Sequence, residues 1–226
     1  MKKLLLIATF VSSQVFAAPQ HTQAIEDAAM QLNTPALVEL SQTTEGYDQA
    51  FSQYRLAINY NLQAEQDKAN EALKVAINTL EALTQQNEND DEAWALLSQS
   101  YGLMIAYQPM KAVFYGPKSG KALAKAKSLN NQNPRIFLVE GISDYHTPAM
   151  FGGSKERSVE ALSQAISLYQ SQAVNDYSWG EAEAYVWRGL ANLELDNKEQ
   201  ALVDFAKATD IAPDYLWPQQ LMKSHQ

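Results

Sequence analysis

The stretch that decides the fold is YVWRGLANLELDNKEQALVDFAKATDIAP, which occupies residues 185–213 near the end of the chain. Its small and apolar residues recur at three- and four-residue steps, and this period predicts two short helices joined by a tight turn. Pro213 ends the second helix, because proline cannot continue a helix. One hairpin of this length cannot bury its own apolar face, so we expect further hairpins earlier in the chain.

The order of residues in this stretch resembles the tetratricopeptide repeat, a 34-residue unit of two helices. Most of the family positions are matched, although Arg188 and Asn192 stand where leucine and tyrosine are usual. The resemblance implies that small residues let the two helices cross closely and that a phenylalanine fills the space between them. The matching positions are Tyr185, Gly189, Ala201, Phe205, Ala208 and Pro213.

Three earlier segments carry the same pattern with more departures. The segment that opens at Trp94 reproduces the first-helix signature through Leu97 and Tyr101, with Ser98 in place of glycine. No alternation of β-branched and aromatic residues indicates a strand. We therefore predict an all-α fold, a right-handed solenoid of antiparallel helix hairpins with about four repeat-like units plus caps, and an irregular helical bundle is the alternative. The units are expected to begin near Tyr47, Trp94, Pro134 and Tyr185.

The first 17 residues have the features of a secretory signal peptide. Lys2 and Lys3 precede an apolar run at residues 4–11, and Val15-Phe16-Ala17 supplies the small residues of a cleavage site. The run is shorter than the roughly 20 apolar residues that a membrane span needs, which disfavours a membrane anchor. We expect cleavage after Ala17 and a periplasmic or secreted protein that has no membrane span in its mature form.

The remainder divides into an N-terminal helical cap, residues 18–46, and a repeat domain, residues 47–226. The cap holds two short helical patterns, AIEDAAMQL and PALVELSQ, with Thr34 suited to the N-cap and Pro35 to the first turn of the second helix. No cysteine is present, so disulfides are excluded. Stability must come from the packing of helices.

The charge balance excludes one large class of partner. The formal net charge at pH 7 is −9, and it becomes −11 when Lys2 and Lys3 leave with the signal peptide. A nucleic-acid-binding protein needs a basic stripe, and an anionic lipid surface rewards basic residues as well. We therefore expect no nucleic acid as a partner.

Units two and three each contain an interruption between their two helices. These are MIAYQPMKAVFYGPKSG, residues 104–120, and HTPAMFGGSKER, residues 146–157. In a solenoid all such connections lie on one edge, so we expect the two insertions to lie next to each other. Long ordered loops are usually functional, although these could instead fold back and cap the array. The candidate contact residues are Phe114, Tyr115, His146, Met150 and Phe151.

The concave groove of the solenoid is a second candidate surface. The positions that face the groove in the family correspond here to a mainly apolar set that includes Tyr54, Ile142 and Tyr145, with His146 as a polar group. Such a groove suits an amphipathic helix or an extended peptide. The N-terminal helix of the chain could instead fill it.

The sequence carries no catalytic motif and predicts no cofactor. It has no nucleophile elbow, no H-E-x-x-H and no cysteine. Glu140 and Asp144 share a helix face and are the pair that could do acid–base work, whereas paired acids on an acidic helical repeat are usually a solvated edge. His146 and Met150 lack a third ligand, so no metal site is predicted.

The function that follows from these observations is a non-enzymatic exported scaffold. It would bind a protein or a peptide through the concave groove and the inserted loops of units two and three. The alternative is a small-ligand or metal-binding accessory protein related to transport, which would use the loops at 107–118 and 146–153. An enzyme that uses Glu140 and Asp144 is the third hypothesis.

Overall fold

The computed structural model describes residues 20–171 and 177–225, and within these ranges the regular structure is helical, with no strand. The proposed signal peptide lies outside the described residues. The elements are α1 (Thr22–Met30), α2 (Thr34–Thr43), α3 (Gly46–Leu62), α4 (Gln66–Gln86), α5 (Asp91–Tyr107), η1 (Pro109–Lys111), α6 (Ala112–Leu129), α7 (Pro134–His146), η2 (Ala149–Phe151), α8 (Lys155–Ser171), α9 (Glu181–Glu194), α10 (Lys198–Ile211) and α11 (Leu216–His225).

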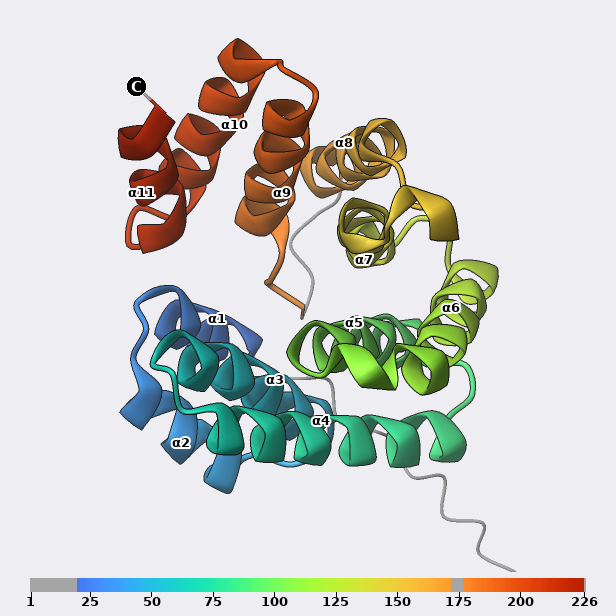
Figure 1. Ribbon diagram of the computed structural model, residues 1–226. Helices are drawn as coiled ribbons and strands as arrows, with labels where there is room; N and C mark the ends of the chain where they lie inside the picture. The colour runs from blue at the N-terminus through green and yellow to red at the C-terminus, as the bar shows by residue number, and fades with distance from the viewer. Residues whose placement is uncertain (1–19, 172–176, 226) are drawn as a thin grey trace, which may run out of the picture.

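Consecutive helices pair into hairpins, and the hairpins follow one another along a curved array (Figure 1). The four main pairs are α3 with α4, α5 with α6, α7 with α8, and α9 with α10, which are the four expected units. The helices α1 and α2 precede them as the N-terminal cap, and α11 packs against α10 at the other end. The predicted solenoid of helix hairpins is confirmed.

Glycine lets the two helices of a hairpin approach each other, as the repeat pattern implies. A Cβ added at Gly189 would lie 2.5 Å from Cε1 of Phe205, which is fully buried in α10. The same holds in unit three, where a Cβ on Gly141 would lie 2.5 Å from Cγ of Leu162. These glycines are therefore required by close packing, because both have ordinary helical backbone.

Replacing Gly189 by alanine should destabilise the fourth hairpin. The added methyl group overpacks the contact with Phe205, and overpacking of this kind costs about 1–3 kcal/mol of the free energy of unfolding. Urea denaturation followed by circular dichroism measures the loss. Gly102 in α5 is the matched control, because a Cβ there meets nothing within 4 Å. Gly102→Ala should stabilise the protein by up to about 1 kcal/mol, and equal losses for both variants would contradict the packing argument.

Helix α2 begins one residue earlier than the sequence pattern indicates. Asn33, rather than Thr34, is its N-cap, and the Asn33 side chain accepts a hydrogen bond from the Ala36 N–H at 3.2 Å. Pro35 lies in the first turn as expected. At the start of α8, Ser154 caps the helix, since its Oγ accepts from the Arg157 N–H at 3.1 Å.

The prediction that a long interruption separates the two helices of unit two is wrong. Helix α5 continues to Tyr107, a single 3-10 turn follows, and α6 already begins at Ala112, so most of residues 104–120 is helical. Met104 and Ala122, which lie on either side of the 3-10 turn, are both buried in the core. Pro117 lies inside α6. Unit two therefore has two long helices where the sequence pattern indicated an interruption between them. In unit three the interruption is real and contains η2.

The array closes on itself. Helices α9 to α11 curve back over α1 and α3, so that the C-terminal half of the chain faces the N-terminal half (Figure 1). Contacts across the closure join residues that are far apart in sequence. Gln31 donates to Asp214 at 3.2 Å, and the Thr22 and Ser178 hydroxyls lie 3.2 Å apart. The segment that precedes α9, residues 177–180, lies at the centre of this closure.

Candidate functional site

The concave groove is filled by the chain's own segment 177–180. The Trp179 ring packs against Phe51 with 5.2 Å between centroids, and its Nε1–H donates to the Tyr47 hydroxyl at 3.0 Å. Two predicted groove residues also lie in the core: Tyr54 is 3% exposed and Ile142 is 7% exposed. In the closed structure these two side chains have no surface to offer a partner. The proposed use of the groove stays a prediction that would require the closure to open.

Three buried charged side chains hold the closure together, and we name them the closure triad. Arg55 of α3 donates to both carboxylate oxygens of Glu183 in α9, at 2.9 and 2.8 Å. The same guanidinium lies 2.6 Å from Oε2 of Glu26 in α1. One positive charge therefore stands between two carboxylates. Burial raises the pKa of Glu26 to about 7, although Arg55 acts in the opposite direction.

A second buried ion pair, between Arg135 and Glu92, holds the segment 177–180 in place. The Arg135 guanidinium at the start of α7 binds Glu92 of α5, with the Nε–H donating at 2.7 Å. Its Nη1 donates to the Tyr177 carbonyl at 2.7 Å. Asn133 completes the cluster by donating to Glu92 at 2.8 Å. Burial raises the pKa of Glu92, and Arg135 opposes this shift. The sequence pattern gives no sign that Glu92 and Arg135 pair, because they belong to different units.

The connections of units two and three and the start of α6 present five exposed large apolar side chains. Met110, Val113 and Phe114 are 94, 88 and 58% exposed, and Met150 and Phe151 are 82 and 72% exposed. We name these five residues the apolar edge. They come from consecutive hairpins, whose connections lie along the same edge of a solenoid. Three of them, Phe114, Met150 and Phe151, are predicted site residues. Large exposed apolar side chains on neighbouring units make these two connections a candidate interaction surface.

Tyr115, the other predicted residue of the first connection, faces inward. Its ring lies 5.4 Å from that of Tyr101 in α5 and 4.9 Å from that of Phe114. Lys118 lies over the Phe114 ring, 4.6 Å from its centroid, and pairs with Glu81 at 2.9 Å. The Tyr115 side chain thus packs against α5 beneath the apolar edge. Phe114 is presented outward while Tyr115 caps the array.

His146 and Tyr145 belong to an aromatic cluster that joins units three and four. Trp187 of α9 lies 5.4 Å from Tyr145 and 5.0 Å from His146, measured between ring centroids. Partial burial and the nearby Lys155 lower the pKa of His146. Trp217 of α11 extends the cluster at 5.2 Å from Trp187. The two predicted residues therefore lie together, but their main contacts are within the protein.

The acids considered for catalysis each have a basic partner. Glu140 accepts from Lys127 at 2.7 and 2.8 Å, and Asp144 accepts from Arg157 at 2.8 Å. Over residues 20–171 and 177–225, no three His, Cys, Asp or Glu side chains are placed to hold a metal ion. Within the same ranges no helix is long and apolar enough to cross a lipid bilayer.

Comparison with known proteins identifies the repeat. The family model for the tetratricopeptide repeat matches residues 182–215. A thermophilic TPR protein of Thermus thermophilus, TTC0263, is 17% identical with a TM-score of 0.54, over 90% of this chain and 98% of that one. The HusA haemophore of Porphyromonas gingivalis is 22% identical with a TM-score of 0.53, over 75% of this chain and 85% of that one. At these identities the likeness concerns the fold. No curated protein sequence matches the chain.

Proposed function

We propose that this chain, whose fold and whose repeat at residues 182–215 are those of tetratricopeptide-repeat proteins, is a non-enzymatic scaffold which binds another protein. Proteins of this architecture generally mediate protein–protein interaction. The observation that carries the proposal is the apolar edge. Its side chains are solvent-exposed, whereas the concave groove is occupied by residues 177–180.

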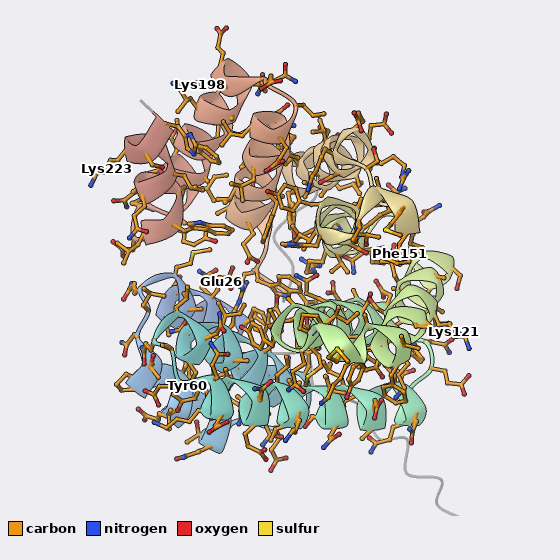
Figure 2. The ribbon with its side chains drawn as sticks, in the orientation of Figure 1. Glu26, Tyr60, Lys121, Phe151, Lys198 and Lys223 are labelled. Carbon is orange, nitrogen blue, oxygen red and sulfur yellow. The ribbon has the colours of Figure 1, made fainter. Side chains whose placement is uncertain are left out.

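The surroundings of the apolar edge favour a partner with acidic groups. The segment 109–131 contains five lysines and no acid, in a chain whose net charge is −9. Lys118 and Lys127 are paired with Glu81 and Glu140, but no carboxylate lies within ion-pair distance of Lys111, Lys121 or Lys125 in the part of the chain that the structure describes. In the view of Figure 2, Phe151 and Lys121 both lie toward the right-hand margin. The partner we propose is a protein segment with apolar anchor residues flanked by acids.

We propose further that this scaffold works outside the cytoplasm. The basis is the signal-peptide pattern at residues 1–17, with cleavage after Ala17. The mature protein would then begin at Ala18 and reside in the periplasm or be secreted. Sequencing the N-terminus of the protein isolated from its own cell envelope checks this directly. Recovery of a chain that still begins at Met1 would contradict it.

Substituting the apolar edge should remove partner binding and leave the fold unchanged. Phe114 and Phe151 are exposed, so the double variant Phe114→Ser, Phe151→Ser is expected to change the free energy of unfolding by less than about 0.5 kcal/mol for each site. Loss of two apolar anchors should weaken partner binding by about tenfold or more. The measurement is photo-crosslinking in the native envelope fraction with a photoreactive residue at Met110 or Phe151, followed by titration of the partner.

The matched control for this experiment is Leu62, which is 64% exposed in α3 and distant in sequence from both connections. A photoreactive residue there should capture no partner, and Leu62→Ser should bind as tightly as the unchanged protein. Equal capture from Leu62 would contradict the assignment of the edge. Capture of a second copy of this chain from Phe151 would assign the edge to self-association.

A further inference from the structure

Two methionines of the apolar edge are far more exposed than the other methionines that the structure describes. The chain has six methionines, and five of them lie within residues 20–171 and 177–225. Met110 is 94% exposed and Met150 is 82% exposed, whereas Met104 of α5 is fully buried. Met30 and Met222 are partly buried. Folding therefore leaves two sulfur atoms in solvent, and both belong to the surface that we propose for partner binding.

The thioether sulfur of methionine is the group in this chain that a mild oxidant attacks first. No cysteine is present, so no thiol competes for the oxidant. A peroxide transfers one oxygen atom to the sulfur. The sulfur lone pair attacks one peroxide oxygen, the O–O bond breaks, and an S–O bond forms. Sulfur loses two electrons and the peroxide gains them, while the departing hydroxide takes up the proton of the transferred hydroxyl group and leaves as water.

Exposure decides which sulfur atoms can react in this way. The peroxide must touch the sulfur, and the sulfur atoms of Met110 and Met150 can be reached from solvent in the closed structure. Met104 is 0% exposed, so its sulfur can be reached only when the protein opens. The structure therefore predicts that oxidation is confined at first to the apolar edge.

The product changes the chemistry of that edge. Methionine sulfoxide is polar, and its oxygen accepts hydrogen bonds from water. A partner that packs on the apolar edge would have to remove this water, and burial of a polar group without a hydrogen-bond donor costs free energy. The fold itself should not suffer, because both side chains project into solvent.

We propose that Met110 and Met150 are reversible oxidation sites, and that their conversion to sulfoxides by a peroxide releases the protein partner from the apolar edge. The release rests on the proposed function, whereas the selective oxidation of the two sites does not. Methionine sulfoxide reductases reverse the step, with one enzyme for each sulfoxide epimer. A dithiol supplies the two electrons and becomes a disulfide, and the sulfoxide oxygen leaves as water.

The first measurement is the selectivity of oxidation. Hydrogen peroxide is added to the purified protein, and mass spectrometry of its peptides follows the gain of one oxygen atom at each methionine. Met110 and Met150 should react at least about tenfold faster than Met104. In a urea concentration that unfolds the chain, the three rates should become similar. The urea midpoint of the oxidised protein should equal that of the untreated protein.

The second measurement is the release of the partner. The purified protein with a photoreactive residue at Phe151 is oxidised by hydrogen peroxide, freed of peroxide by catalase, and only then added to the native envelope fraction. Oxidation should lower the yield of the photo-crosslinked partner by about tenfold. Treatment with both sulfoxide reductases and dithiothreitol before the crosslinking should restore the yield.

The double variant Met110→Leu, Met150→Leu identifies the residues. Leucine has a similar volume, stays apolar and has no sulfur to oxidise. The variant should capture the partner as well as the unchanged protein and should keep this yield after peroxide treatment. Met104→Leu is the matched control, because it removes a buried sulfur from α5. It should lose the partner on oxidation as the unchanged protein does.

Three outcomes would overturn the proposal. The first is oxidation of Met104 as fast as that of Met110 in the folded protein. The second is a captured partner whose yield does not change when both edge methionines are oxidised. The third is an equal loss of yield in the leucine double variant, which would assign the effect to another residue. If no partner is captured even before oxidation, the proposed function fails and the release fails with it, while the first measurement alone decides the selectivity.

Discussion

Replacing Trp179 by alanine is expected to lower the free energy of unfolding by about 3–5 kcal/mol, the usual cost of truncating a buried tryptophan. Trp179 is 3% exposed and contacts Phe51 and Tyr47 of α3 from a segment that precedes α9. Its removal leaves a cavity between the two halves of the chain and an unpaired hydroxyl on Tyr47. Stability and closure should therefore be lost together.

Two measurements separate these effects. Urea denaturation gives the free energy, and small-angle scattering at low denaturant gives the dimensions, which should increase if the halves separate. Trp217→Ala is the matched control, because Trp217 is only partly buried in α11 and packs against Trp187. We expect it to cost clearly less than Trp179→Ala and to leave the dimensions unchanged. A Trp179→Ala protein as stable as the unchanged one would show that segment 177–180 is not part of the core.

Replacing Arg55 by alanine is expected to cost about 3–5 kcal/mol, because removal of one partner leaves a buried charge without compensation. Here the substitution removes the ion-pair partner of two carboxylates, Glu26 and Glu183, because the guanidinium lies between them. The destabilisation relative to the unchanged protein should therefore be largest at neutral pH and smaller at acid pH, where Glu26, whose pKa is raised by burial, binds a proton. Thermal unfolding over a pH series measures both effects.

Arg157→Ala is the control for this arginine. Arg157 also pairs with a carboxylate, Asp144 at 2.8 Å, but its side chain is 52% exposed. Exposed pairs contribute about 0–1 kcal/mol, so the control should be nearly neutral. Adding Glu26→Gln and Glu183→Gln to an Arg55→Met protein should restore most of the lost stability, since no buried charge then remains. If the triple variant is no more stable than Arg55→Ala, the loss comes from packing instead of charge.

The parts of the fold that the sequence predicts are those decided by neighbouring residues. The period of Tyr185, Gly189 and Phe205 reflects contacts within one hairpin, and the structure has that hairpin with Gly189 against Phe205. The cap helices and the Ser154 N-cap are equally local. The end of α5 was misplaced because QPMK looks like a loop, whereas one 3-10 turn suffices and a helix lies on either side of it.

The candidate sites were predictable to a smaller extent, because they depend on how distant units meet. The sequence shows that Phe114, Met150 and Phe151 are apolar residues in connections between helices, and their exposure could be predicted from that position. The closure, which brings Trp179 against Phe51 from over 100 residues away, does not follow from the sequence in this way. The one signal for this was a tryptophan beside Gly180 in a linker. The pairing of Glu26 with Arg55 is not predicted from the sequence for the same reason, because the two residues lie on different helices.

The closure of the array has a consequence for how the protein folds. In an open array of repeats each unit contacts only its neighbours, so the ends fray first and folding can begin anywhere. Here Glu26 near the start of the described chain and Glu183 in the last hairpin share one arginine, and Gln31 reaches Asp214. Fraying of either end must break those contacts, so we expect both ends to unfold in the same transition. Contacts of such long sequence separation also slow folding. This solenoid should therefore unfold in a single cooperative step and fold more slowly than a linear array of equal length.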